Sequence, residues 1–385
     1  MTLPELSPLL AELTQLRHEL HRLAELSGQE TDTAQHLQHY LQRYSPGQLL
    51  SGLGSGTGLV AIFEGKKLGP TLMLRADMDA LPIADANQLP YSSRKQGVSH
   101  KCGHDGHMSM LAGLAPLLAR HPLKRGRLLL LMQPAEETGQ GARALLKDER
   151  FTSLAPDYIF GLHNLPGYPL GQVVLREGTF CPASKGLHVT LRGRTAHAAE
   201  PELGHSPANA LAELLQQLPK LPPTTQPAEL SLLTLTHARL GDSSFGISPG
   251  EAELLATLRA NLQPDMDRLS EAVEHLLHQT ASAQGLGLSL EYREVFPATT
   301  NGAEAFACMQ RAATAAGLDV HLKQDPFRWS EDFGCYNQLA PSGFFGLGAG
   351  LEQPNLHNAA YDFPDALLPY GLRMYWALIG QLLGH

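Results

Sequence analysis

Short apolar runs separated by mixed segments mark the first and last parts of the chain. Apolar side chains at helical spacing predict helices over residues 6–23, 107–121 and 365–384. Strands that are apolar on both faces and alternate with helices predict an α/β fold, with a mixed, largely parallel sheet flanked by helices. Four apolar runs predict these strands: "TLMLR" (71–75), "LLLLMQ" (128–133), "YIFGL" (158–162) and "FFGLG" (344–348).

The middle of the chain has a different periodicity, in which apolar and polar residues alternate as in half-exposed antiparallel strands. The order of expected elements is strand–helix–strand–strand–helix–strand, which is that of a ferredoxin-like α+β unit. We therefore predict a domain over residues 183–296, inserted into a first domain made of residues 1–182 and 297–385. The expected strands are 186–194, 231–240, 251–261 and 286–295, with helices over 206–218 and 265–284.

Composition and charge limit the classes of function. The 385 residues are 43% hydrophobic and 17% charged, which allows a buried core and argues against disorder. A net charge of −9 argues against nucleic-acid or anionic-membrane partners, which favour basic surfaces. The sequence predicts neither a membrane helix nor a signal peptide, because long apolar runs and a basic start are lacking. Four cysteines are too few for a disulfide framework, so we expect a cytoplasmic protein.

Polar side chains gather where the predicted strands end. "RADMD" (75–79), "PAEE" (134–137) and "HN" (163–164) each follow a strand, and "HKCGHDGH" (100–107) opens a helix. In open α/β sheets the ligand crevice lies outside the carboxyl ends of the strands. Each segment alone has an ordinary structural interpretation as a turn, a cap or a solvated loop, but together they predict a site. The residues expected at this edge are Asp77, Asp79, Cys102, His104, Glu136, Glu137 and His163.

Thiolate, imidazole and carboxylate groups are the donors that zinc and related divalent metals prefer. Five protein ligands are enough for two metal ions if one ligand bridges them and a position stays open for water. A second carboxylate that binds no metal can then take the proton of that water and pass it to a leaving amine. The adjacent side chains of Glu136 and Glu137 point in different directions and could divide these two duties.

These segments resemble a known family, the co-catalytic metallohydrolases of the aminoacylase/carboxypeptidase clan. The resemblance is to the branch of hippurate hydrolases and auxin-conjugate amidohydrolases, which cleave N-acyl amino acids. It runs in order from about residue 70 to the end and implies a zinc-exopeptidase-like catalytic domain with an inserted lid and dimerisation domain. The motifs are "LRADMDALPI", "HKCGHDGHM", "QPAEETGQGA", "GLHN", "GRTAHAAEP", "WSEDFGCY" and "LHNAAYDFPDALLPYG".

The resemblance implies two divalent metal ions per subunit, with Cys102 as the bridging ligand where sister branches have aspartate. Zinc is favoured by the thiolate and imidazoles, with manganese or cobalt as alternatives. Glu136 would be the general base and acid, and Asp79 would orient the site from behind the ligands. Asp77 stands where sister branches have a metal-binding histidine. The remaining metal ligands would be His104, Glu137, His163 and His357.

Two further roles are implied in the inserted domain, through which the family forms homodimers. His197 in "GRTAHAAEP" matches the histidine that polarises the substrate carbonyl, often across a dimer. Arg259 in "ATLRA" matches a residue associated with the substrate carboxylate, a role that suits the guanidinium fork. Glu200 and Gly246 depart from the family pattern without touching a proposed ligand, so they bear on the fit of the substrate.

Other classes of function are less well supported. "GISPG" (246–250) matches the serine-hydrolase motif G-x-S-x-G, but Pro249 has no backbone N–H to donate to an oxyanion. The glycine spacing of "GLGSGTG" (52–58) does not fit a nucleotide-binding loop. The remaining alternatives are a dipeptidase or carboxypeptidase of the same clan and a non-catalytic metal- and ligand-binding homologue. A closed structural metal site would not need the spare carboxylate of Glu136.

Overall fold

The computed structural model describes residues 3–385, whose contacts divide the chain into two compact units. The first unit comprises Met1–Phe180, Thr299–Pro326 and Glu331–His385, and the second comprises Cys181–Ala298 and Phe327–Ser330. The second unit therefore also takes up four residues of the returning chain. No helix of residues 3–385 combines the length and the apolar character needed to cross a bilayer.

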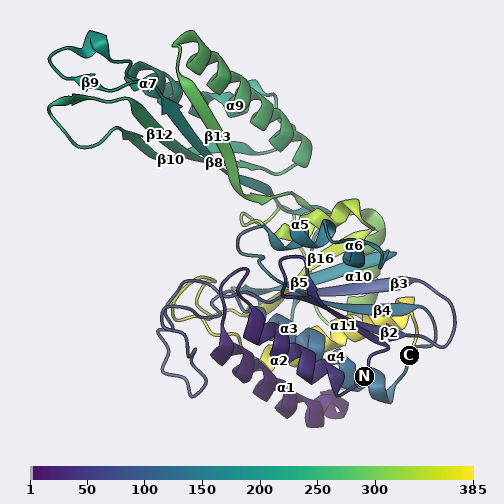
Figure 1. Cartoon of the computed structure of the whole chain (residues 1–385). Coiled ribbons are helices and arrows are strands. Elements are labelled where there is room, and N and C mark those ends of the chain that lie inside the picture. The colour runs from purple at the N-terminus through teal and green to yellow at the C-terminus, as the bar shows by residue number, and fades with distance from the viewer. Residues whose placement is uncertain (1–2) are drawn as a thin grey trace. The chain divides into compact units, whose positions relative to one another are not determined.

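A mixed, largely parallel sheet forms the centre of the first unit (Figure 1). Its order over the described residues is β1-β2-β4-β3-β5-β16-β6-β15. Strands β4, β3, β5 and β16 run parallel to their neighbours in this series and are buried almost throughout, as the apolar runs predict. The strands are β1 (Gln48–Leu53), β2 (Gly58–Glu64), β3 (Thr71–Asp77), β4 (Arg127–Gln133), β5 (Tyr158–Pro166), β6 (Val173–Leu175), β15 (Val320–Leu322) and β16 (Ser342–Gly350). A separate pair joins β7 (Gly178–Cys181) to β14 (Thr299–Asn301).

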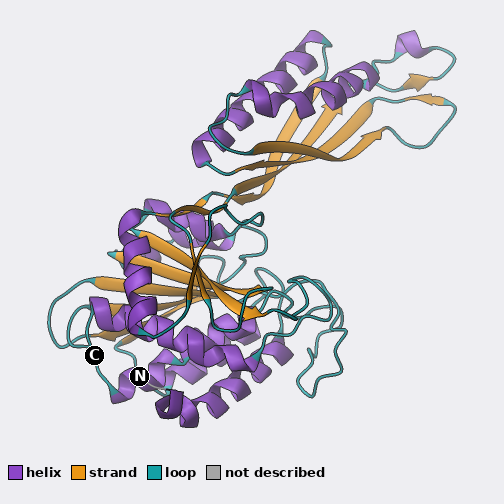
Figure 2. Cartoon of the chain, turned by 180° about the vertical axis from the view of Figure 1, so that it is seen from behind, coloured by secondary structure: helices purple, strands orange, loops and turns teal. Residues whose placement is uncertain are grey.

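Helices cover both faces of this sheet, as Figures 1 and 2 show. Side chains of one sheet face, such as Leu72 and Leu74, join one continuous apolar core with helices from both ends of the chain. On that face lie α1 (Leu3–Leu23), α3 (His104–Ala112), α4 (Leu114–Arg120), α10 (Ala303–Ala315) and α11 (Leu368–Leu382), with α2 (Thr31–Gln42) beside them. The short helices α5 (Gly141–Leu146) and α6 (Glu149–Thr152) lie on the opposite face of the sheet.

One expected helix is divided in two. The prediction of a single helix over 107–121 is wrong, because α3 ends at Ala112 and α4 begins at Leu114. Pro116 has no N–H to donate to the carbonyl of Ala112, four residues earlier, so the ladder of an uninterrupted helix cannot form there.

The second unit has the ferredoxin-like arrangement that the periodicity predicts. Its four described main strands pair antiparallel in the order β10-β12-β8-β13. Apolar residues of these strands form a core with α7 (Ala208–Gln217) and α9 (Gln263–Ala283). The strands are β8 (Ala183–Arg192), β10 (Ser231–Leu240), β12 (Glu251–Ala260) and β13 (Gly287–Phe296), with a small pair β9 (Ala196–His197) and β11 (Ile247–Ser248) and a short helix α8 (Leu221–Thr224).

Candidate metal centre

The carboxyl ends of the parallel strands of the first unit deliver the predicted donors to one edge of the sheet. β3 ends at Asp77, which lies opposite Gln133, the last residue of β4. The segment 134–137 follows β4 directly, and His163 lies near the end of β5. Helix α3 begins at His104, so its first turn faces the same edge.

The structure brings all five predicted metal ligands together with Glu136. Their donor atoms form overlapping groups within which all atoms lie within 4.8 Å of one another. Cys102 belongs to two of these groups, as a bridging ligand would. The groups are Cys102–His104–His163, Cys102–Glu137–His357 and His104–Glu136–Glu137.

Two buried donor atoms at this centre lack hydrogen-bond partners, as is expected where a cation binds. Among residues 3–385, neither His104 Nε2 nor Glu137 Oε1 has a hydrogen-bond partner, although both atoms are buried. An unsatisfied buried polar atom costs about 1–3 kcal/mol, so natural proteins rarely leave two facing each other. His104 Nε2 and Glu137 Oε1 lie 3.8 Å apart. A metal ion between these atoms and the thiol of Cys102 would satisfy them.

Backbone carbonyls fix the orientation of two of the imidazoles. His104 Nδ1 lies 2.8 Å from the carbonyl oxygen of Asp79, and His163 Nδ1 lies 2.9 Å from that of Asn164. A carbonyl only accepts, so each Nδ1 carries a proton and each Nε2 is the nitrogen that can bind a metal once it has no proton of its own. His163 Nε2 is 3.3 Å from Cys102 Sγ. Both rings therefore have the tautomer that a metal ligand requires.

The electrostatics of the centre also favour a cation. Burial and the carboxylate of Glu137 raise the pKa of the Cys102 thiol well above its usual range. Burial would lower the pKa of His104, but Asp77 and Asp79 raise it to about 10. The carboxylates thus hold a proton on His104 when no other positive charge is present. A divalent metal would replace this proton and stabilise the thiolate.

Asp79 holds the loop that carries the two glutamates. Its Oδ1 accepts from the backbone N–H of Glu136 at 3.1 Å, and its Oδ2 accepts from that of Glu137 at 2.9 Å. Ser27 Oγ donates to the same Oδ2 at 2.6 Å. The carboxylate of Asp79 thereby orients both glutamates, and its Oδ1 also lies 3.6 Å from Nδ1 of the proposed ligand His104.

A buried ion network that the sequence did not reveal lies behind the centre. The guanidinium of Arg75 contacts Asp77, Glu331 and Asp332, each at 2.8 Å, and all four side chains are buried. Burial, followed by the charges of Glu331 and Glu137, raises the pKa of Glu136 well above its usual range.

His107 also lies at this centre, although no role was predicted for it from the sequence. Its Nδ1 lies 2.6 Å from Asp77 Oδ1, and its Nε2 lies 2.5 Å from Asn164 Oδ1. Asp77 is therefore shared between His107 and Arg75, and its Oδ2 also lies 3.5 Å from His104 Nε2, the nitrogen that faces the centre. His107 stands in the stretch "HKCGHDGH", but the sequence of that stretch alone does not distinguish metal ligands from the residues that orient them.

His197 and Arg259 both belong to the second unit, so their roles stay predictions. His197 is exposed on β9, and its Nδ1 accepts from the backbone N–H of Ala199 at 3.0 Å. Arg259 on β12 donates from Nη1 to the carbonyl of Arg328 at 2.9 Å and contacts Ser330 Oγ at 3.2 Å. Partial burial lowers the pKa of this guanidinium.

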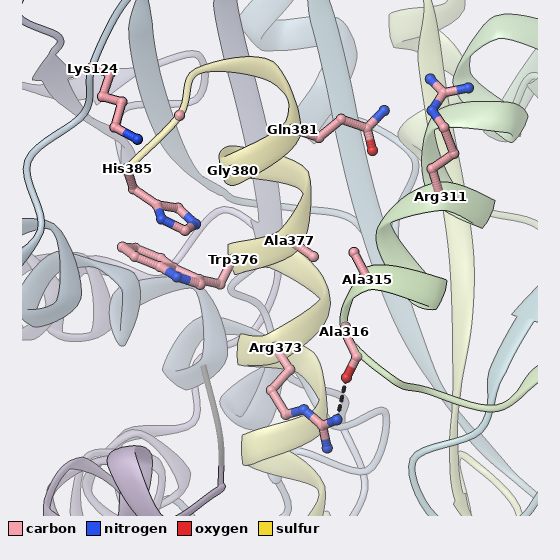
Figure 3. A pocket seen from close by; sticks show the side chains of 11 residues that line it. Lys124, Arg311, Ala315, Ala316, Arg373, Trp376, Ala377, Gly380, Gln381 and His385 are labelled. Carbon is pink, nitrogen blue, oxygen red and sulfur yellow. Dashed lines mark hydrogen bonds between the residues drawn. The ribbon is translucent and has the colours of Figure 1, made fainter.

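A separate pocket of about 560 Å³ lies between α10 and α11 of the first unit (Figure 3). Lys124, Arg311 and Arg373 line it together with Trp376. Figure 3 shows Lys124 and Arg311 at opposite ends and Arg373 turned to the carbonyl of Ala316. The cations do not converge on one point, so this pocket does not compete with the metal centre as a catalytic site.

Comparisons with known proteins identify the family and relatives of the chain. Residues 73–381 match the model of peptidase family M20/M25/M40. The chain is 30% identical over 378 residues to hippurate hydrolase of Campylobacter jejuni, covering 97% of each protein. It is 28% identical over 360 residues to N-acetylcysteine deacetylase of Bacillus subtilis, covering 92% of this chain and 93% of the relative.

Solved structures share the fold over nearly the whole chain. A dinuclear metal-binding peptidase of the M20 family from Bacillus subtilis superimposes with a TM-score of 0.81 at 25% identity, covering 97% of this chain and 98% of that one. The aminobenzoyl-glutamate utilization protein of Klebsiella pneumoniae gives 0.74 at 21% identity, with 97% of each chain covered.

The fold, the donor cluster and these relatives define a metal-dependent hydrolase that cleaves amide bonds. Within this class, the chain belongs to peptidase family M20/M25/M40. The resemblance to the aminoacylase and hippurate hydrolase branch is thereby confirmed.

Proposed function

We propose that the protein hydrolyses N-acyl-L-amino acids to a carboxylate and the free amino acid. The observation that carries the proposal is the membership of Cys102 in two donor groups, with Glu136 grouped beside His104 and Glu137. Two relatives whose names specify hippurate and N-acetylcysteine, both N-acyl amino acids, support this class of substrate.

The roles of the residues follow from the chemistry of amide cleavage. Two divalent ions held by Cys102 and its neighbouring ligands would acidify water and polarise the amide carbonyl. Glu136 takes the proton of the attacking water on its carboxylate and passes it to the leaving nitrogen. His197 stabilises the carbonyl oxygen as it becomes anionic, and Arg259 pairs with the carboxylate of the substrate. The proposed ligands are Cys102, His104, Glu137, His163 and His357.

The identity of the metal is part of the proposal. A thiolate together with three imidazoles favours zinc, whereas manganese and cobalt accept the same donors. Affinity alone does not decide which metal a protein holds in the cell, so the assay must include each metal separately.

A panel of substrates tests the proposal. Metal-free protein is loaded with zinc, manganese or cobalt, and release of amino acid is measured from N-benzoyl and N-acetyl amino acids and from dipeptides. We expect metal-dependent release from the N-acyl compounds. Preference for the dipeptides would favour a dipeptidase or carboxypeptidase, and retained metal without any hydrolysis would favour a binding protein.

We also propose that the protein forms a homodimer through the second unit and works in the cytoplasm. β10 is an edge strand of its sheet, so its outer backbone groups can pair with another strand. Large apolar side chains are exposed on β10 and in the segment after it, among them Leu232, Phe245 and Ile247. Such a surface is typical of a site covered by a partner. None of the four cysteines forms a disulfide in the described part of the chain, which suits a reducing compartment.

A further inference from the structure

The loop that follows β4 carries both glutamates of the centre and has an unusual backbone. Ala135, directly before Glu136, has a φ of +53°, in the left-handed region that residues with a side chain rarely adopt. Such a conformation is strained and persists only where surrounding contacts impose it. The contacts of the neighbouring backbone N–H groups, together with those of the carbonyl of Ala135, therefore bear on where the glutamates point.

Two buried carboxylates hold three consecutive N–H groups of this loop. Asp79 accepts from Glu136 and Glu137, as described above. The third N–H, that of Ala135, donates to Glu30 Oε1 at 2.8 Å. Glu30 is completely buried and comes from the segment between α1 and α2, more than a hundred residues earlier in the chain.

Glu30 stands directly before the first turn of α2, where a side chain usually caps the helix. It is the N-cap residue of α2, yet within the described chain its side chain makes no capping bond to that helix. Instead it accepts from the backbone N–H of Gly28 at 2.9 Å and from Thr57 Oγ1 at 3.0 Å, besides Ala135. The N–H of Thr33 in the first turn of α2 donates to Glu25 Oε2 at 2.9 Å. Glu25 thus takes over the cap and leaves Glu30 to the loop.

We infer that Glu30 is a positioning residue for the reaction: it holds Ala135 in its left-handed conformation and so aims Glu136 and Glu137 at the metal centre. This inference rests on the proposed amidohydrolase function. A departure from local capping preference is expected where a residue serves a functional site instead of its own helix.

Kinetics of substituted proteins test the inference. Glu30→Leu keeps roughly the volume and removes the acceptor, so we expect kcat to fall about 100-fold while KM changes less than about 3-fold. Glu30→Gln keeps an acceptor oxygen for Ala135 and should recover most of kcat. Glu25→Leu is the matched control, because it removes a buried carboxylate of the same segment that caps α2 without touching the loop.

Backbone hydrogen exchange gives a readout that needs neither substrate nor metal. Faster exchange at residues 135–137 is expected in Glu30→Leu but not in Glu25→Leu. If Glu30→Leu does not fold, Thr57→Val removes one donor to Glu30 and should give the same pattern on a smaller scale. Unchanged kcat and exchange in the Glu30 variant, or equal losses in the Glu25 variant, would overturn the inference. If the unsubstituted protein cleaves no amide, the proposed function fails and the exchange data alone decide whether Glu30 anchors the loop.

Discussion

Glu136 and Glu137 are neighbours in the sequence, but their carboxyl groups meet different surroundings. Glu137 Oε2 lies 3.7 Å from His357 Nε2, and its Oε1 faces His104. Glu136 Oε1 instead accepts from the backbone N–H of Asp332 at 3.4 Å. The second glutamate is therefore placed among metal donors, and the first is placed between those donors and the buried network around Arg75.

Substitution of Glu136 by glutamine separates metal binding from proton transfer. Glu136→Gln keeps the shape of the side chain but cannot take up a proton, so we expect metal content to stay and kcat to fall about 10³-fold. Glu137→Gln is the control, which should lose metal as well as activity. Elemental analysis and turnover of both variants check this, and full activity of Glu136→Gln would remove it from the mechanism.

His21 on α1 makes the stability of the protein depend on pH. Burial disfavours its charged form, but hydrogen bonds to Asp105 and Asp85 raise its pKa to about 9, from 6.5. A group with a raised folded-state pKa stabilises the fold fully below pH 6.5 and loses that contribution as the pH rises through 9.

We therefore expect the unfolding free energy to fall between pH 6.5 and 9, by at most about 3 kcal/mol from this group. His21→Gln cannot titrate and should show a flatter dependence over the same range. Urea unfolding of both proteins near the two ends of the range measures the difference. Equal slopes would show that the ion pairs of His21 do not contribute.

Helix α3 links the metal centre to the core. All nine of its residues are buried, and its first residue is the proposed ligand His104. Gly106 follows in the first turn, and a Cβ atom there would overlap the ring of Phe363. The absence of a side chain at this position therefore sets how closely the helix approaches the C-terminal part of the chain.

Gly106→Ala tests this packing, because helix propensity and close packing predict opposite effects of the substitution on stability. In an unconstrained helix the change would stabilise by about 1 kcal/mol, whereas overpacking here should cost about 1–3 kcal/mol. We expect a net loss of stability and weaker retention of metal. Gly302→Ala is the control, since apart from the two chain neighbours none of the described residues has a heavy atom within 4 Å of an added Cβ atom there. A Gly106 variant as stable as the control would contradict the close packing.

The elements and most of the donors could be predicted because their signals are local. Buried strands leave apolar runs, and donors such as Glu137 and His163 stand just after such runs. The partners of these donors could not be predicted, because pairs such as Arg75 and Glu331 are 256 positions apart and are chosen by tertiary packing. Glu30 left no signal at all, since it lies before residue 70, where the family resemblance begins.

At the scale of the whole molecule, the chain interrupts one compact unit with another. The first unit holds the donor cluster and Glu136, whereas His197 and Arg259 belong to the second. A complete site for an N-acyl amino acid, as proposed, needs groups from both units. These groups come either from one chain or, in a dimer, from two.

Mixing two inactive variants decides between these alternatives. Glu136→Gln lacks the proton carrier in the first unit, and His197→Ala lacks the carbonyl-binding group in the second. If sites are shared between chains, a mixed dimer has one site with both groups intact, so an exchanged mixture should regain about a quarter of full activity. A mixture of the two variants whose subunits have not exchanged is the control, and it should stay inactive. No recovery in a mixture that demonstrably contains mixed dimers would place both groups of each site on the same chain.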